Sequence, residues 1–214
     1  MTLDHILDIT DYSIILPCII GMVLFNKIEK SFRYLILVLI AGFVNELFQF
    51  VATNAQLKII AQVVYLIIHF QLYLALFFSW DNSKRSLVTR TIIHSCFFII
   101  AAFNVFYSHM HMVMSMVNMG LFVVVSAYAM YVIHLENCGA NSTRAGLSRK
   151  LIIIPFIVFN VYFVSLQIVI FFLYDALSED FFVHLFCVIR FINILTYISY
   201  SLGIKWAPKK ETYL

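Results

Sequence analysis

Residues 151–174 read LIIIPFIVFNVYFVSLQIVIFFLY and contain no charged residue. An α-helix rises about 1.5 Å per residue, so this run is long enough to cross the roughly 30 Å hydrocarbon layer of a bilayer. Its apolar residues are continuous, whereas the strands of a membrane barrel alternate apolar and polar positions. The run therefore predicts a transmembrane helix, and similar runs fill most of the chain.

The composition agrees with a membrane protein. Of the 214 residues, 63% are hydrophobic and 12% are charged. Soluble domains are about half apolar and about a quarter charged, so an ordinary soluble protein, a disordered chain and a coiled coil are excluded. The formal net charge of +3 is too small to indicate a nucleic-acid partner. The lipid bilayer is the first partner that the sequence predicts.

We predict an all-α membrane protein, a bundle of seven transmembrane helices that forms a single domain over residues 1–214. Pro17 and Pro155 are expected either to kink their helices or to lie in the first turn. No cleavable signal peptide is expected, because residues 1–9 contain no Lys or Arg. The predicted spans are 9–25, 34–53, 59–80, 91–107, 112–133, 151–174 and 182–202.

The basic residues predict an orientation. All but Lys58 and Arg190 of the 14 Lys and Arg residues lie in the connectors 26–33, 81–90 and 137–150 or in the tail after residue 202. With seven spans these four segments fall on one side of the membrane. Cytoplasmic loops carry the excess of Lys and Arg, so the N-terminus is predicted outside and the C-terminus inside. We expect a multi-pass protein of a bacterial inner membrane.

Two charged residues lie well inside the predicted spans. Glu46 is in the second span and Arg190 is in the seventh, and both are expected about 10–12 Å below the outer surface. A charge near the bilayer centre costs about 2.5–3.5 kcal/mol, so such residues usually face the bundle interior. A Glu46–Arg190 pair is geometrically allowed if the two helices approach each other. It would either lock the bundle together or supply the charges of a ligand or ion pocket.

Other polar residues recur at helical spacing around these two charges. His69 belongs to a stripe on the third span with Gln62, Tyr65 and Tyr73, and Asn193 shares a face with Arg190 and Tyr197. Hydrogen bonds between helices would also explain single Asn and Gln residues. We interpret the cluster as a polar pocket in the outer half of the membrane. The candidate ligand-binding residues are Glu46, Arg190, His69, Asn193, Asn45, Gln49, Asn160 and Gln167.

No cofactor is predicted. The segment 109–119 contains two His and several Met residues, which would suit Cu(I), but adaptable apolar packing explains the same residues. No two of the four cysteines have CxxC spacing, so a disulfide framework or a zinc ribbon is not expected. The sequence gives no positive support for an enzyme. It contains no GxSxG, P-loop or HxxxH motif, and the span 182–202 lacks the lysine that a retinal protein needs.

Several short motifs carry a resemblance. They are Leu16-Pro17, Asn45-Glu46-Leu47, an aromatic-rich run that ends in Trp80, and the close from Tyr200 to Trp206 followed by Pro208-Lys209-Lys210. With the span pattern, they make the chain similar to a group of uncharacterised small seven-helix membrane proteins of Bacteroidota. Some members of that group lie near histidine-kinase genes, so the resemblance implies a sensory role. It covers nearly the whole chain.

The first functional hypothesis is a receptor-like or sensory membrane protein. It would bind a small or lipidic ligand in the outer-half pocket and signal through a partner protein that contacts its basic loops. The second is a transporter of a small solute in which Glu46 couples transport to a proton or an ion. The third is a structural subunit of a membrane complex, whose polar residues only join helices.

Overall fold

The structure, a computed structural model, describes residues 12–80, 88, 91–96, 99, 124–131, 144–173 and 178–209. Within these ranges the chain is helical, and residues 91–96 and 124–131 belong to this helical part. The extended exception is an isolated antiparallel bridge between Ile28 and Lys209. The all-α class is confirmed for this part of the chain. The named elements are η1 (Tyr12–Ile14), α2 (Ile15–Leu24), α3 (Lys30–Val51), α4 (Ala55–Trp80), α7 (Arg144–Leu173) and α8 (Glu179–Trp206).

Four of these helices are long and apolar enough to cross a membrane. The qualifying segments are Lys30–Val51, Ile60–Trp80, Ala145–Ile170 and Phe181–Trp206, which match the second, third, sixth and seventh predicted spans. The first predicted span corresponds to η1 and to the shorter apolar helix α2. The spans 91–107 and 112–133 lie largely outside the described residues. Seven spans therefore remain a prediction.

The two prolines occupy different positions in their helices. Pro17 lies in the first turn of α2, where its missing N–H has no helical partner to lose. Pro155 lies inside α7, because that helix begins at Arg144 and not at Leu151. The start of the apolar run marks the expected edge of the membrane, and the helix continues past it through polar residues. Hydropathy therefore located the span but not the beginning of the helix.

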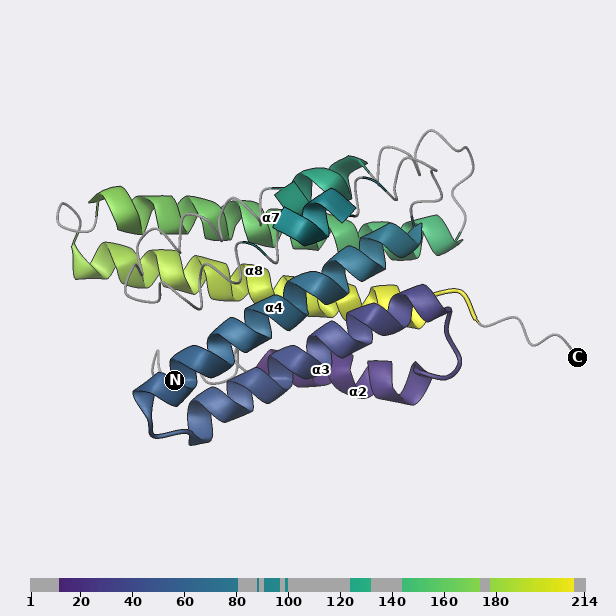
Figure 1. The fold of residues 1–214 in the computed structure, drawn as a ribbon, viewed down its shortest axis with the longest axis horizontal. Helices are drawn as coiled ribbons and strands as arrows, with labels where there is room; N and C mark the ends of the chain where they lie inside the picture. Colours follow the sequence, from purple (N-terminus) through teal and green to yellow (C-terminus); the bar gives the residue numbers. More distant parts are fainter. Residues whose placement is uncertain are drawn as a thin grey trace, which may run out of the picture.

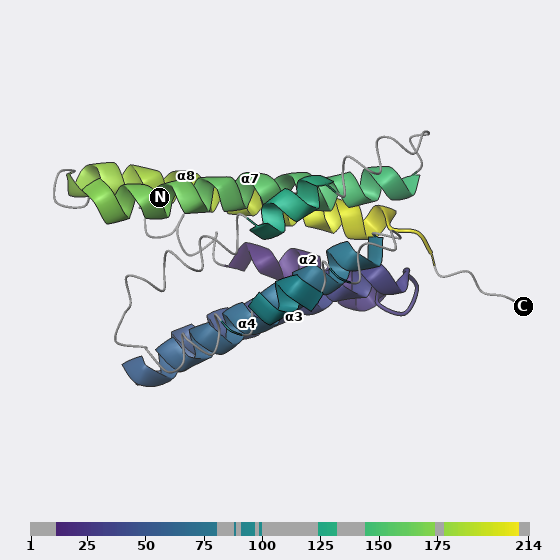
Figure 2. The same ribbon diagram turned by 45° about the horizontal axis from the view of Figure 1, so that its top comes forward.

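The long helices form two antiparallel hairpins, which Figure 1 shows side by side. Helix α3 packs against α4, α7 packs against α8, and the short helix α2 contacts both α8 and α3. Figure 2 shows that the hairpins lie close together where α3 begins and α8 ends, and diverge toward the opposite end. The second helix of each hairpin returns the chain to the end at which the first began.

Burial follows this divergence. The fully buried residues Phe32, Phe77, Ile152 and Ile204 come from all four long helices and lie toward the end where the hairpins meet. In α3 every buried residue lies at or before Gly42. Helices α7 and α8 approach closely there, since Ser148 Oγ donates a hydrogen bond of 2.6 Å to the carbonyl oxygen of Gly203. A Cβ on Gly203 would lie 3.2 Å from the Ser148 carbonyl oxygen, so only glycine fits comfortably.

The described basic residues other than Lys58 and Arg190 lie at or near this packed end. Figure 1 shows the ends of α2, α4 and α8 and the starts of α3 and α7 together there. The guanidinium of Arg149 lies 5.7 Å from the ring centroid of Trp80, and that of Arg33 lies 5.4 Å from the ring centroid of Phe25. The backbone N–H of Glu29 donates to the Pro208 carbonyl oxygen at 2.9 Å, which ties the α2–α3 connector to the tail. We call this region the basic end. Which side of a membrane it faces stays a prediction.

Candidate ligand-binding site

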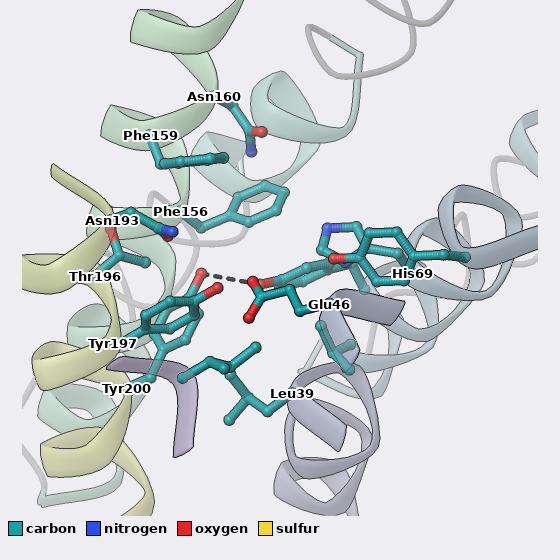
Figure 3. Close-up of a pocket in the computed structure, with 14 residues that line it drawn as sticks. Leu39, Glu46, His69, Phe156, Phe159, Asn160, Asn193, Thr196, Tyr197 and Tyr200 are labelled. Atoms are coloured by element: carbon teal, nitrogen blue, oxygen red, sulfur yellow. Dashed lines mark hydrogen bonds between the residues drawn. The ribbon is translucent and has the colours of Figure 1, made fainter. Parts of the chain in front are cut away.

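A cavity of about 200 Å³ lies between the two hairpins, next to the buried core and on the side away from the basic end. Figure 3 shows its side chains pointing inward from several helices. One lining residue, Ile14, comes from η1, and the others come from α3, α4, α7 and α8. The described lining residues are Ile14, Val38, Leu39, Glu46, Tyr65, His69, Tyr73, Phe156, Phe159, Asn160, Asn193, Thr196, Tyr197 and Tyr200.

Helix α3 supplies the carboxylate of the cavity. Glu46 follows Leu39 by seven residues, which is two helical turns, so the two side chains share one face of the helix. In Figure 3 the Glu46 carboxylate points toward Tyr197 and Tyr200 of α8. The wall is therefore apolar toward the basic end and acidic farther along the same helix.

Helix α4 contributes a polar and aromatic stripe. Tyr65, His69 and Tyr73 follow each other at intervals of four residues and all line the cavity. The Tyr65 hydroxyl and His69 Nδ1 are 2.9 Å apart and share a hydrogen bond. The Tyr73 hydroxyl lies 3.0 Å from the Tyr200 hydroxyl of α8, and this hydrogen bond joins the two hairpins. The sequence prediction of a single stripe is confirmed for these three residues.

Helices α7 and α8 form the opposite wall. The Thr196 hydroxyl donates to the backbone carbonyl of Ile192 at 2.9 Å, which satisfies its hydrogen atom within α8. The Phe156 ring centroid is 4.4 Å from that of Tyr73, so aromatic side chains fill the space between the hairpins. Asn160 is only 2% exposed. Its Nδ2 atom is buried and has no hydrogen-bond partner among the described residues.

Four of the eight candidate residues from the sequence line this cavity. They are Glu46, His69, Asn160 and Asn193, and they come from α3, α4, α7 and α8 in turn. The structure therefore brings together residues that are far apart in the chain.

The other four candidates lie outside the lining. Asn45 Nδ2 donates to Gln62 Oε1 at 3.1 Å, and Gln49 Nε2 donates to the Lys58 carbonyl oxygen at 3.0 Å. These two hydrogen bonds join α3 to α4. They agree with the alternative prediction that single Asn and Gln residues form hydrogen bonds between helices. Gln167 is half-buried on α7 and is not among the described lining residues.

Arg190 is also outside the cavity lining. Its Nη1 atom is buried and lacks a hydrogen-bond partner in the described part of the chain. A pair between Arg190 and Glu46 therefore stays a prediction.

The sequence-based list omitted several lining residues. Thr196 and Tyr200 follow Asn193 and Tyr197 of α8 by three residues each, so they belong to the same face of the helix. Helical spacing could therefore have identified them from the sequence. Phe156 and Phe159 of α7 gave no such signal, because aromatic residues are frequent in every span. Only the placement of α7 beside α4 and α8 distinguishes them from lipid-facing rings.

The cavity offers a carboxylate, amides, hydroxyls, one imidazole and aromatic faces. Among the described residues, no three His, Cys, Asp or Glu side chains gather in a group that could hold a metal ion. Cys18, Cys96 and Cys187 are free thiols. The His and Met segment 109–119 lies outside the described residues.

Comparison of the chain with protein-family models, with curated proteins and with solved structures finds no match. The function of the site is therefore inferred from its own residues.

Proposed function

We propose that this chain is a small receptor-like membrane protein that binds a small ligand in the cavity between its two helix hairpins. The observation that carries the proposal is Asn160, which lines the cavity while its buried Nδ2 atom has no partner among the described residues. Buried polar groups in folded proteins are nearly always hydrogen-bonded, and an unpaired donor costs about 1–3 kcal/mol. A ligand that accepts a hydrogen bond from Asn160 would remove this cost.

The position of the cavity supports the same proposal. Small-molecule sites are concave, mostly apolar and equipped with a few convergent polar groups, and sites between helices of a bundle are common. Here Val38, Leu39 and Phe156 supply apolar surface, while Glu46 and Asn160 supply polar groups from different helices. An intramembrane carboxylate is also a functional candidate by default, because its charge is expensive in lipid.

The proposed membrane arrangement has seven spans, an external N-terminus and a basic end that faces the cytoplasm of a bacterium. The described Lys and Arg residues other than Lys58 and Arg190 lie in or near the helix ends that meet at one end of the bundle, which supports it, because cytoplasmic segments are enriched in these residues. The cavity would then lie on the outer side of the packed core. A ligand could reach it from outside, and a signalling partner could contact the basic end.

A transporter is the second candidate. The cavity lies between two helix hairpins, and transporters commonly bind their substrate between helical units near the middle of the membrane. Uptake into proteoliposomes distinguishes the two functions. A receptor binds its ligand without moving it, whereas a transporter shows saturable uptake that is lost in Glu46→Gln.

A thermal-stability screen of the purified protein against metabolites and lipids tests the proposal. A ligand at about one hundred times its dissociation constant adds about 2.7 kcal/mol of stability, which is readily measured. We expect at least one hit that is lost in Glu46→Gln and retained in Asn45→Ala. Asn45 is the matched control, because it neighbours Glu46 on α3 but lies outside the cavity lining.

A result that contradicts the proposal would differ both in the screen and in the stability of Glu46→Gln. Absence of any hit, together with lower stability of Glu46→Gln, would mean that Glu46 holds the bundle together. The chain would then be a structural subunit, and a search for co-purifying proteins would follow.

A further inference from the structure

We propose that the cavity binds a small organic ammonium ion that also carries an oxygen acceptor. This inference rests on the proposed ligand-binding function and specifies the class of its ligand. It depends on three features of the cavity: the sign of its charge, the aromatic character of its walls, and its size together with the donor of Asn160.

The charge of the cavity favours a cation. Glu46 lines it, and none of the described lining residues is Lys or Arg. The nearest base on α8, Arg190, lies outside the lining. A carboxylate in a water-poor site attracts any ammonium group by its charge, and it accepts a charge-assisted hydrogen bond where that group carries an N–H. An anionic ligand would instead meet the Glu46 carboxylate at close range.

The walls of the cavity add a second preference for a cation. Aromatic rings line it from three helices, and the Tyr73 and Phe156 centroids are only 4.4 Å apart. Figure 3 shows Phe156, Phe159 and Tyr197 around the same space that the Glu46 carboxylate faces. Ring faces attract ammonium groups electrostatically, and aromatic cages use this attraction to recognise alkylated amines. The same rings also receive the apolar part of the ligand.

The size of the cavity and the buried donor of Asn160 further restrict the class of ligand. The cavity holds about 200 Å³, and a protein cavity of about 150 Å³ is known to accept benzene. The ligand is therefore about as large as benzene or slightly larger. Asn160 Nδ2 is a buried donor without a described partner, so the ligand needs an oxygen that accepts a hydrogen bond.

Two pairs of probes of matched shape test the inference on the full chain in a neutral detergent. The cations are choline and 3-hydroxybenzylamine, and their neutral counterparts are 3,3-dimethylbutan-1-ol and 3-hydroxybenzyl alcohol. Calorimetry gives each dissociation constant. We expect at least one cation to bind more tightly than its counterpart by about tenfold or more, which corresponds to about 1.4 kcal/mol.

Substitutions then show which residues produce the preference for a cation over its neutral counterpart. Glu46→Gln should reduce the cation preference to less than about threefold, whereas Asn45→Ala should leave it unchanged. Phe159→Leu keeps an apolar wall but removes a ring face, so it should weaken the cation more than the alcohol. This second variant keeps the test decisive if Glu46→Gln does not fold.

Equal affinities within each pair, or no binding of either cation at millimolar concentration, would overturn the inference. If the screen meanwhile finds a neutral or anionic ligand that needs Glu46, the proposed function survives and only the ligand class is wrong. If neither the screen nor the cations give binding, both proposals fail.

Discussion

The two halves of the bundle differ in how they are held together. Toward the basic end, residues such as Phe32 and Phe77 are 0% exposed and pack with Trp80 in the apolar core. Beyond the cavity, α8 contains no buried residue between Phe181 and Ile192, and Phe50 near the end of α3 is 80% exposed. The cavity lies where one half gives way to the other.

This difference separates stability from function. The packed half supplies the buried apolar contacts that define the positions of all four long helices. The other half carries exposed apolar side chains, which suit contact with lipid, and the polar groups that the proposed ligand would contact. Binding regions are commonly drawn from the less stable parts of a structure, while the closely packed part sets the geometry.

The largest expected effect is in the packed half. Phe77→Ala should lower the free energy of unfolding by about 3–5 kcal/mol, because it removes a fully buried ring that contacts Tyr73, Trp80 and Phe156. The matched control Phe50→Ala should change it by less than about 0.5 kcal/mol. Unfolding by a denaturing detergent measures both. Similar losses in the two variants would remove the distinction between the halves.

The next largest expected effect is an increase in the free energy of unfolding, caused by a substitution in the cavity. Asn160→Leu should raise the free energy of unfolding by about 1–2 kcal/mol without ligand, because it removes a buried donor that has no described partner. Asn45→Leu also removes a buried oxygen without a described partner, but it breaks the hydrogen bond from Asn45 Nδ2 to Gln62, so any gain in stability should be smaller than that from Asn160→Leu. A greater loss from Asn160→Leu than from Asn45→Leu would show that Asn160 joins helices as Asn45 does.

The smallest effect concerns the hydrogen bond at the boundary between the halves. Tyr73→Phe and Tyr200→Phe should be coupled by about 0.6 kcal/mol in a double-mutant cycle, because their hydroxyls lie 3.0 Å apart and connect the hairpins. Thermal unfolding of the two single variants and the double variant supplies the cycle. Zero coupling would mean that the two hydroxyls act independently.

Much of the described fold could be predicted from the sequence. Long apolar runs identify the four long helices, since in lipid the backbone must satisfy its own hydrogen bonds. Each basic connector is separated from the next by two predicted spans, so the sequence also predicted that the start of α3 and the end of α8 share one end of the bundle. The starting residue of α7 could not be predicted, because helix formation does not stop where hydropathy falls.

The site was predicted only in part, for a physical reason. Spacing within one helix shows which residues share a face, so it grouped His69 and Asn193 with other residues that line the cavity, and the cost of a charge in lipid indicated an inward position for Glu46. Spacing does not show how far apart two helices lie. Depth alone therefore suggested that Arg190 could meet Glu46, whereas the described structure places Arg190 outside the cavity that Glu46 lines.

The most direct test of the account is the stability of the ligand-free double variant Glu46→Gln with Asn160→Leu. If these side chains serve a ligand, their removal takes a charge, and a donor without a partner among the described residues, out of the bundle interior. The free energy of unfolding should then equal or exceed that of the unmodified protein. A loss of more than about 2 kcal/mol would contradict the account, because it would show that Glu46 and Asn160 hold the helices together.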